Sequence, residues 1–594
     1  MSRPTIAFLG AALASVVLGI GLAIGPPAPT GGSDATGGEA LARGRPVLPV
    51  RWIAPSTAKI RPGDRPPAGA PSTIRLRLLR GECELAHLAL AAGARPIADV
   101  AARIETAPGN GVSVRLYREV LVELPRSSGP DGEAGRWPDP LVPAVDPIFG
   151  EPRRAFPFTV PAGENRAIAV EACAAADAAP GLRRASLRLE AGPLSGPVPL
   201  ELRIEPTAIP ATATLPTSFG FSALRAALGH HGRPGTADEL QALDRAYRTA
   251  LLAHRISVHG GTMEPPPFRR TAAGIELDFA AYDRELAPFL EGRILPGGAR
   301  ATTAELRTHP GLASDAERLA YWRAIARHHR ERGWEAILFD YAKDEPKEAD
   351  LPAVAARARL VRRADPSIRV LVTAPFHPSL DGLVDLWTPN LNCLFVRSRP
   401  DEYCPWRAPR SAYRAPWWYV SCSSHGCGEG PKGRYFAGWP GYAIDLAGAR
   451  ARATGWLAFG EGIGGELYWD TVYGYAPTGR PLDVWSGEGL RAFGVNGDGT
   501  LLYPGTPARI GGASHVPVES LRLKAIRDGL EDHELLRLVA ALPGGEAAVR
   551  RELRRLVPDP WAIEADPAAW EAARGRLLDV LAAGVPRAAP PPRE

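Results

Sequence analysis

The first third of the chain alternates apolar and polar residues with a period of two. This alternation extends from about Leu48 to Ile209 and is interrupted by clusters of Gly, Pro and Asp. The clearest runs are Thr73–Leu78, Val112–Tyr117, Ser186–Leu189 and Val198–Ile204. A period of two is typical of strands with one buried and one solvated face, and many such strands between turn residues favour a β-sandwich. We therefore predict a β-sandwich over residues 47–209.

After a Pro/Ala/Thr linker, short apolar runs alternate with helical patterns. The candidate strands are Ser218–Phe221, Ile256–His259, Arg293–Leu295, Ala336–Tyr341, Arg369–Thr373, Leu383–Trp387, Trp417–Cys422 and Gly465–Trp469. Helical patterns lie between several of them, notably Asp315–Arg332 and Pro352–Arg363. Eight strands alternating with helices predict a TIM-like (β/α)8 barrel over residues 215–515.

The last part of the chain has a helical pattern. The Gly-rich stretch Gly494–Gly505 predicts the tip of a hairpin. From Val518 to Ala541 the leucines fall near one face of a helix, and Trp561–Leu581 continue the pattern. We predict a C-terminal helical region over residues 516–583 and a disordered, Pro-rich tail over residues 584–594. The fold class is therefore multidomain, with a sandwich, a barrel and a helical extension.

The N-terminus has the pattern of a targeting segment. Arg3 precedes an apolar run, Ile6–Ile24, and a Pro-rich, then Gly/Ser/Thr-rich stretch follows. A short basic region before an apolar run is typical of a secretory signal, while about 20 apolar residues can also span a bilayer. We predict a signal peptide or membrane anchor over residues 1–25, a flexible linker over residues 26–46 and a possible membrane tether through residues 6–24. The protein is then exported, as a periplasmic, cell-surface or secreted protein.

Cysteine usage fits an oxidising compartment. Two of the six cysteines, Cys83 and Cys173, lie early in the chain, and we predict that they form a disulfide. The connectivity of the other four stays open among three possibilities. These are Cys393, Cys404, Cys422 and Cys427. We predict no metal site, because the pair Cys422 and Cys427 has no second ligand pair.

Composition and charge exclude several classes of protein. The chain has 594 residues, of which 45% are hydrophobic and 23% charged, so it is not disordered as a whole. Gly and Pro are abundant but lack a three-residue period, which excludes collagen. The net charge of +5 is spread over the chain without a basic block, and we predict no nucleic-acid partner.

Two adjacent carboxylates follow the fourth predicted barrel strand, in the sequence Asp344-Glu345-Pro346. Catalytic groups in a barrel come from the C-terminal ends of the strands. Neighbouring carboxylates repel each other, so one of them holds its proton more tightly and can serve as an acid. Side chains of neighbouring residues in a strand point to opposite faces, so both can enter one pocket only if the strand has already ended. The alternative is a solvated acidic loop before a helix.

The other predicted strand ends are rich in aromatic and short polar residues. Aromatic rings suit the C–H faces of sugars, and polar groups suit their hydroxyls. The candidate substrate-binding residues are Glu264, His377, Trp387, Asn390, Trp418, Tyr419, Tyr468, Trp469 and Asp470. Each alone could be a packing residue, and their shared position at strand ends favours a glycan as the substrate. This chemistry requires no cofactor.

Several motifs together resemble glycoside hydrolase family 123 and its relatives known as domain of unknown function 4091. The motifs are Arg80-Gly81-Glu82, Trp137–Pro143, Asp344-Glu345-Pro346, Trp418–Cys422, Gly438–Asp445, Arg452 with Gly455-Trp456-Leu457, Gly465–Trp469, and Ser520–Arg522 through Ala525–Glu534. The last is the most specific. The chain departs from the family pattern at Gly81, His87 and His533, where Asn, Gln and an aromatic residue would be expected.

The resemblance implies a barrel that hydrolyses β-linked N-acetylgalactosamine with retention. The nucleophile in that family is the substrate's own 2-acetamido group, an exception to the rule that relates carboxylate separation to stereochemistry. Asp344 would orient the acetamido group, and Glu345 would protonate the leaving oxygen and then activate water. Two alternatives stay open, namely a glycosidase of other specificity and a non-catalytic surface protein that binds carbohydrate.

Overall fold

The computed structural model describes residues 48–109, 111–261, 264–272, 274–395, 404–421 and 437–584. The chain divides into two units, Met1–Arg45 and Pro46–Glu594, and the fold below is that of the second unit. The predicted signal or anchor, the linker up to residue 46 and the tail beyond Gly584 lie outside the described residues. Within the described ranges, no helix has the length and apolar character needed to cross a membrane.

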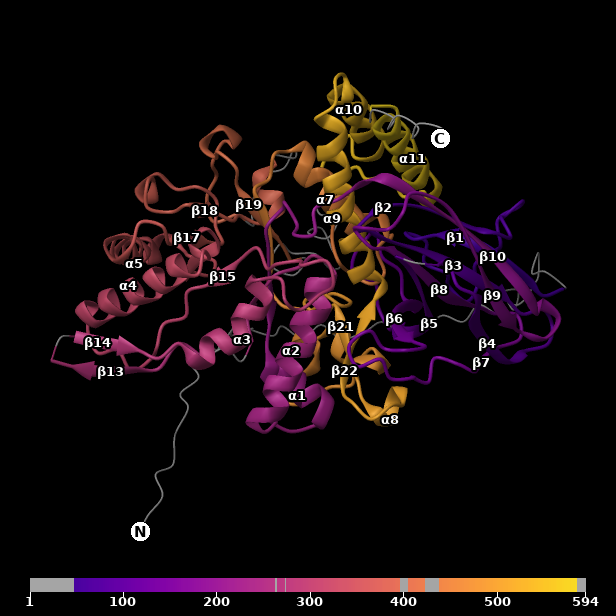
Figure 1. The fold of residues 1–594 in the computed structure, drawn as a ribbon, viewed down its shortest axis with the longest axis horizontal. Coiled ribbons are helices and arrows are strands. Elements are labelled where there is room, and N and C mark those ends of the chain that lie inside the picture. The colour runs from indigo at the N-terminus through magenta and orange to yellow at the C-terminus, as the bar shows by residue number, and fades with distance from the viewer. Residues whose placement is uncertain are drawn as a thin grey trace, which may run out of the picture. The chain divides into compact units, whose positions relative to one another are not determined.

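Two β-sheets make up most of the N-terminal region (Figure 1). The strands of one, in spatial order, are β1 (Val50–Pro55), β3 (Cys83–Ala91), β8 (Asn165–Ala174), β5 (Val112–Leu124), β6 (Gly135–Pro143), β22 (Val516–Ser520) and β21 (Leu502–Gly505). The strands of the other are β2 (Ile74–Arg80), β10 (Gly196–Ala208), β9 (Gly181–Glu190), β4 (Ile97–Thr106) and β7 (Phe158–Val160). Leu76 and Leu202 of the second sheet pack with Leu88 and Ile168 of the first in one apolar cluster. The inward residues of the period-two pattern therefore form this core.

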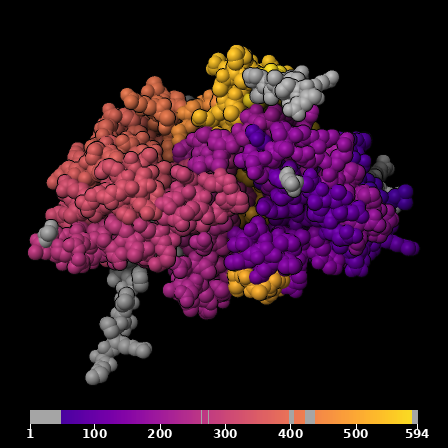
Figure 2. Space-filling view, viewed as in Figure 1, coloured from indigo at the N-terminus to yellow at the C-terminus, as the bar shows by residue number. Residues whose placement is uncertain are grey.

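The last two strands of the seven-stranded sheet come from far along the chain. β22 pairs antiparallel with β6, so that Glu519 lies opposite Leu141. Figure 2 shows orange-yellow surface atoms from this part of the chain beside the purple N-terminal atoms. The region predicted as helical from residue 516 thus begins with a strand. The predicted hairpin tip was also misplaced, because the tight turns at residues 494–500 precede β21 and the hairpin loop is residues 506–515.

Eight further strands form two four-stranded parallel sheets. The first, in spatial order, contains β12 (Val258–Gly260), β11 (Thr217–Phe221), β20 (Gly465–Tyr468) and β19 (Trp417–Val420). The second contains β15 (Ala304–Glu305), β16 (Leu338–Lys343), β17 (Arg369–Val372) and β18 (Leu386–Trp387). Each sheet is half of the predicted barrel. The predicted strand Arg293–Leu295 was wrong, because that segment is irregular and bent, and β15 takes its place in the order.

Helices separate many of these strands. They are α1 (Ala223–His231), α2 (Ala237–Ala253), α3 (Ala280–Leu290), α4 (Asp315–Glu331), α5 (Leu351–Ala364) and α7 (Ala449–Gly460), and a hairpin of β13 (Phe268–Thr271) and β14 (Gly274–Leu277) precedes α3. The side chain of Ser314 accepts from the backbone N–H of Glu317 and so caps the first turn of α4. Residues 373–385, all of them described, contain one 3-10 turn (Pro378–Leu380) and no α-helix. This connection departs from the predicted strand–helix alternation.

The remaining helices follow the hairpin strands. They are α8 (Pro507–Ile510), α9 (Leu521–Ala540), α10 (Gly545–Leu556) and α11 (Pro567–Gly584). α9 lies between the parallel strands and the N-terminal sheets (Figure 1), and it packs against α7. A Cβ atom at Gly455 of α7 would overlap the carbonyl oxygen of Gly529 of α9. Glycines therefore allow the two backbones to touch where the helices cross.

Candidate active site

The parallel strands share an apolar interior to which both sheets contribute. Its buried members are Phe339, Leu371, Leu386, Trp417, Tyr419 and Leu467. Because side chains alternate along a strand, the residue two positions further along points to the same side. The next inward positions are Tyr341 on β16 and Thr373 after β17. The C-terminal ends of these strands therefore face a common space.

The acidic pair follows an irregular end of β16. The pairing of β16 with β17 shifts register between Tyr341 and Lys343, and the strand ends at Lys343. Glu345 has a φ of 39°, in the left-handed region that a non-glycine residue occupies at a cost of about 1–3 kcal/mol. Both Asp344 and Glu345 are exposed, whereas Pro346 is buried. The break in the strand lets two neighbouring carboxylates lie on one side.

Two hydroxyl groups hold the carboxylate of Asp344. The Tyr341 hydroxyl and the Thr373 Oγ1 each donate to Asp344 Oδ1 at 2.8 Å. Thr373 Oγ1 also accepts the backbone N–H of Glu345 at 2.8 Å. One threonine hydroxyl therefore fixes the side chain of one acid and the backbone of the other.

A different hydroxyl holds Glu345. Tyr419 Oη on β19 donates to Glu345 Oε1 at 2.6 Å. Burial and then the charge of Glu345 raise the pKa of Tyr419 well above its usual value, and burial and then Asp344 do the same for the pKa of Tyr341. Both phenols stay protonated at neutral pH and remain donors to the carboxylates. The two acids are thus positioned by separate partners.

A histidine that the sequence reasoning did not single out lies beside this pair. The ring of His259 on β12 lies 5.9 Å, edge to face, from the ring of Tyr341. Its Nδ1 is 3.0 Å from Ser218 Oγ, and burial lowers the pKa of His259. Glu305 on β15 accepts the backbone N–H of Gly260 at 3.2 Å. His259 could have been found from its place at the end of the second predicted strand. Glu305 could not, because it lies on β15, whereas the third strand was predicted at Arg293–Leu295.

Of the nine predicted substrate-binding residues, Tyr419 donates a hydrogen bond to the acidic pair. Trp387, Trp418 and Tyr468 occupy alternate positions and are buried on the other side of their strands, among residues that pack toward the helices. Trp418 donates to Glu466 at 3.3 Å and is fully buried. These three side chains pack in the core, and their role as substrate contacts stays a prediction.

The other predicted residues lie around the strand ends. Glu264 is exposed in the segment after β12, and the His377 ring lies against Trp406 with its Nδ1 2.8 Å from Ser379 Oγ. Asn390 is buried and forms a parallel bridge with Tyr419. Asp470 is buried against Arg225, and burial raises the pKa of Asp470 to about 6.

Two disulfides lie in the described part of the chain. One joins Cys83 to Cys173, which lie opposite each other on β3 and β8. The other joins Cys393 to Cys404 in the region after β18. Cys422 and Cys427 lie outside the described residues.

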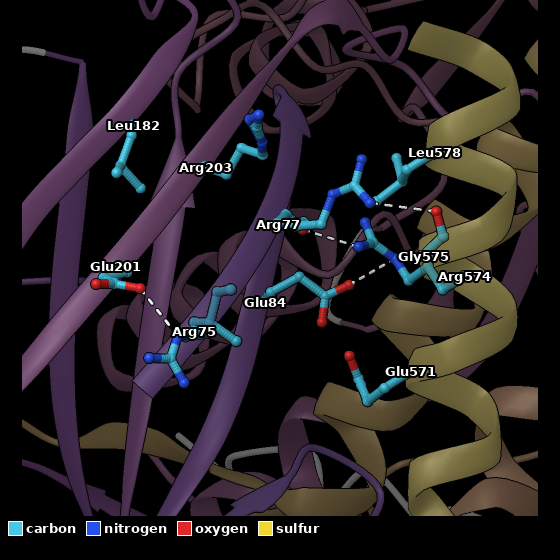
Figure 3. Close-up of a pocket in the computed structure, with 11 residues that line it drawn as sticks. Arg75, Arg77, Glu84, Leu182, Glu201, Arg203, Glu571, Arg574, Gly575 and Leu578 are labelled. Atoms are coloured by element: carbon cyan, nitrogen blue, oxygen red, sulfur yellow. Dashed lines mark hydrogen bonds and ion pairs between the residues drawn. The ribbon is translucent and has the colours of Figure 1, made fainter. Parts of the chain in front are cut away.

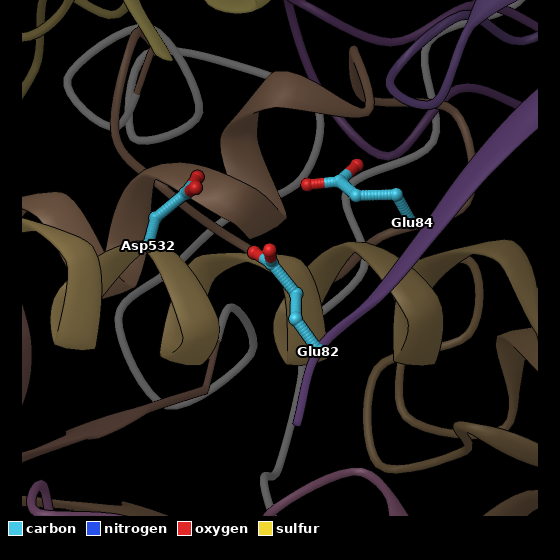
Figure 4. Close-up of side chains that lie close together, drawn as sticks. All are labelled: Glu82, Glu84 and Asp532. Atoms are coloured by element: carbon cyan, nitrogen blue, oxygen red, sulfur yellow. The ribbon is translucent and has the colours of Figure 1, made fainter. Parts of the chain in front are cut away.

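Three buried carboxylates, Glu82, Glu84 and Asp532, come together between β3 and α9 (Figure 4). Their partners are arginines, because Arg574 binds Glu84 at 2.9 Å and also contacts Glu82, while Arg452 binds Asp532 at 2.6 Å. Buried ion pairs of this kind tie two parts of a fold together, because loss of one partner would leave an uncompensated buried charge. This cluster explains the charged residues of the Ala525–Glu534 motif as parts of an interface.

A cavity of about 400 Å³ lies between the five-stranded sheet and α11 (Figure 3). Its charged side chains are largely paired within the protein, as in the bond of Arg75 to Glu201 at 2.9 Å and of Arg77 to the carbonyl oxygen of Gly575 at 3.2 Å. It contains neither Asp344 nor Glu345. The candidate active site is therefore the set of strand ends around the acidic pair.

Comparison with known proteins fits this site. Residues 316–539 match the sequence model described as "Glycoside hydrolase 123, catalytic domain", and this range includes the acidic pair. No curated protein matches the chain. The chain is a glycoside hydrolase. Its residues 316–539 match the family 123 catalytic domain, which confirms the resemblance found in the motifs.

A solved family 123 glycoside hydrolase from Clostridium perfringens, described as hydrolysing glycolipid glycans, has a similar fold. The TM-score is 0.59 at 13% identity, over 90% of this chain and 98% of that one. A putative α-galactosidase from Bacteroides fragilis gives a TM-score of 0.15 at 12% identity over 53% of each chain, which is too low for an argument. The similarity to the first structure supports the multidomain arrangement of a sheet-rich N-terminal region, parallel strands and C-terminal helices.

Proposed function

We propose that this glycoside hydrolase is a retaining β-N-acetylgalactosaminidase-like enzyme in which the 2-acetamido group of the substrate is the nucleophile. One observation carries the proposal. Two adjacent carboxylates at a strand end have separate hydroxyl donors, Tyr341 and Thr373 for Asp344 and Tyr419 for Glu345. Two acids with different hydrogen-bond partners can take different roles in one reaction.

In the first step the acetamido carbonyl oxygen bonds to the anomeric carbon as the bond to the leaving oxygen breaks. Glu345 gives its proton to that oxygen and becomes a carboxylate. Asp344, held at Oδ1 by two donors, orients the acetamido N–H and balances the positive charge of the oxazolinium ring. Water then adds to the anomeric carbon, the ring opens, and the proton of the water returns to Glu345. The two inversions give net retention.

We also propose that the two parallel sheets close into one (β/α)8 barrel. The strands follow one another in the order of the chain, and β20 pairs back onto β11. The parallel bridge from Asn390 to Tyr419 and the shared interior cluster support the closure. Export remains part of the proposal, with a signal peptide or tether in residues 1–25. The disulfides Cys83–Cys173 and Cys393–Cys404 support an oxidising compartment.

The test is hydrolysis of aryl β-N-acetylgalactosaminide and aryl β-N-acetylglucosaminide by the full chain. Glu345→Gln should lower turnover of the galacto substrate by at least about 100-fold, the lower range for general acid catalysis, with a smaller loss on a very good leaving group. Asp344→Asn should weaken binding of a thiazoline that mimics the oxazolinium ring. Absence of turnover by the wild-type protein on both substrates would reject the proposed specificity.

A further inference from the structure

Three histidine rings from distant parts of the chain come together at the end of α1. His230 and His231 are the last residues of this helix, which packs against β21, and His515 lies in the loop between β21 and β22 (Figure 1). The Nδ1 atoms of His230 and His515 are 3.1 Å apart, and the ring centroid of His231 is 4.4 Å from that of His515. The prediction of no metal site rested on the cysteines, because 285 positions separate His230 from His515 and no motif spacing links them.

The two facing nitrogens of His230 and His515 limit what can lie between them. A neutral imidazole nitrogen either carries a proton or offers a lone pair, and two lone pairs at 3.1 Å repel each other. The contact is favourable when one nitrogen carries a proton or when a cation binds both lone pairs. Zn²⁺ binds imidazole nitrogen at about 2.0–2.1 Å, so two ligands of a tetrahedral ion are about 3.3 Å apart. The observed separation is therefore close to that of two zinc ligands.

The other ring nitrogen of His230 has a partner that suits a metal ligand. His230 Nε2 is 2.9 Å from the Tyr247 hydroxyl, which is 2.9 Å from the Tyr475 hydroxyl. When Nε2–H donates to Tyr247 and Tyr247 donates to Tyr475, the Nδ1 atom of His230 keeps its lone pair. A metal-ligating histidine almost always donates its other N–H to such a partner, which fixes the tautomer and the direction of the ring.

The surroundings of the rings keep them in the form that binds metal. Burial and then the neighbouring histidines lower the pKa of His230 well below its usual value, and burial and then His231 lower the pKa of His515. Glu239 and Arg153 act on His515 in opposite directions, because the carboxylate raises its pKa and the guanidinium lowers it. Neutral imidazole is the ligand form, and the C-terminal end of a helix carries a partial negative charge that favours a cation. The rings are therefore neutral at neutral pH and lie where a positive charge is favoured.

We propose that His230, His231 and His515 form a binding site for a divalent transition-metal ion, with Zn²⁺ as the ion that the geometry fits. His230 and His515 bind through Nδ1, water completes the shell, and His231 is the third ligand, because it is half-buried at the helix end and can turn its ring toward the pair. The ion joins α1, which follows the parallel strand β11, to the loop before β22, which belongs to the seven-stranded sheet. Its role is to cross-link these two parts of the fold.

Calorimetry of the metal-free full chain with ZnCl₂ at neutral pH tests the site. One Zn²⁺ should bind per chain, and His230→Gln and His515→Gln should each weaken binding by more than about 10-fold, since even loss of a ligating histidine's partner costs that much. Tyr247→Phe should weaken it about 10-fold. His309→Gln is the matched control, because His309 is also half-buried and its Nδ1 accepts the backbone N–H of Gly311 at 3.0 Å. Equal binding by all variants would show an adventitious ion only, and absence of binding would leave a hydrogen-bonded histidine pair; either result overturns the proposal.

Thermal unfolding separates the loss of a ligand from a loss of folding. The midpoint of each variant is measured with EDTA and then with excess Zn²⁺. Zn²⁺ should raise the midpoint of the wild-type protein and of His309→Gln, because an ion that binds the folded state stabilises it, and should leave His230→Gln and His515→Gln unchanged. An equal rise in all four proteins would place the ion elsewhere and reject the site. Neither measurement needs a substrate, so the result is independent of the proposed function.

Discussion

Replacing Tyr419 by Phe removes the hydroxyl that donates to Glu345 at 2.6 Å and leaves the ring in the interior cluster. A hydrogen bond to an ionised group contributes about 1.5–3 kcal/mol. Because Glu345 is exposed, we take the lower end, and about 1.5 kcal/mol corresponds to about a factor of ten in rate. The bond stabilises the carboxylate that Glu345 becomes as it gives its proton to the leaving oxygen. The value of kcat/KM for a substrate with a poor leaving group should therefore fall about tenfold.

The assay is kcat/KM for two aryl galactosaminides, one with a poor and one with a very good leaving group, because the latter needs less protonation. The matched control is Tyr321→Phe on α4, because the buried Tyr321 hydroxyl donates to the Pro266 carbonyl at 2.7 Å. That variant should keep the wild-type values. If Tyr419→Phe lowers kcat/KM equally for both substrates, the hydroxyl does not act through Glu345, and the reasoning fails.

Two further predictions concern stability. Gly455→Ala should lower the free energy of unfolding by about 1–3 kcal/mol, because the new methyl group meets the Gly529 backbone. The control is Gly575→Ala, which has open space around its Cβ position and should leave the free energy of unfolding unchanged. Urea denaturation of both variants measures the difference. Burial lowers the pKa of His329 to about 4, so between about pH 6.5 and pH 4 the unfolded state binds one proton more. Stability should then fall with falling pH, and His329→Gln should make the slope shallower by up to about 1.4 kcal/mol per pH unit, whereas an unchanged slope would contradict the assigned pKa.

The parallel strands were predictable where apolar residues cluster or alternate along the sequence. Seven of the eight predicted barrel strands overlap observed ones. β15 has two residues, Ala304 and Glu305, and no apolar run marks it. The prediction was placed on the apolar residues Ile294 and Leu295 instead. The position of β15 depends on its pairing with β16, which is a tertiary contact.

The acidic pair was found from its motif, but its partners were not. Whether Trp418 or Tyr419 faces the interior depends on the register of β19, and a shift of one residue exchanges the two faces. Both sides of these strands are buried, so neither face is marked by polar residues. Thr373 and Tyr341 are recognisable as donors to Asp344 only in the structure, where β16 and β17 lie side by side. Likewise, the one-sided helix predicted for α9 is buried on nearly all sides, because arginines of α7 and α11 neutralise its carboxylates.

The pairing of β22 with β6 has a consequence for the modularity of this enzyme. The catalytic domain recognised by sequence similarity, residues 316–539, contains a strand that completes the sheet of the N-terminal region. Cutting the chain near residue 209 would leave that strand with an unpaired edge and would remove Glu84 from Arg452 and Arg574. The segment matched by the family model is thus smaller than the unit that folds. The N-terminal sheets are part of that unit, so they cannot be removed or exchanged as an accessory module without exposing this edge and unpairing these buried charges.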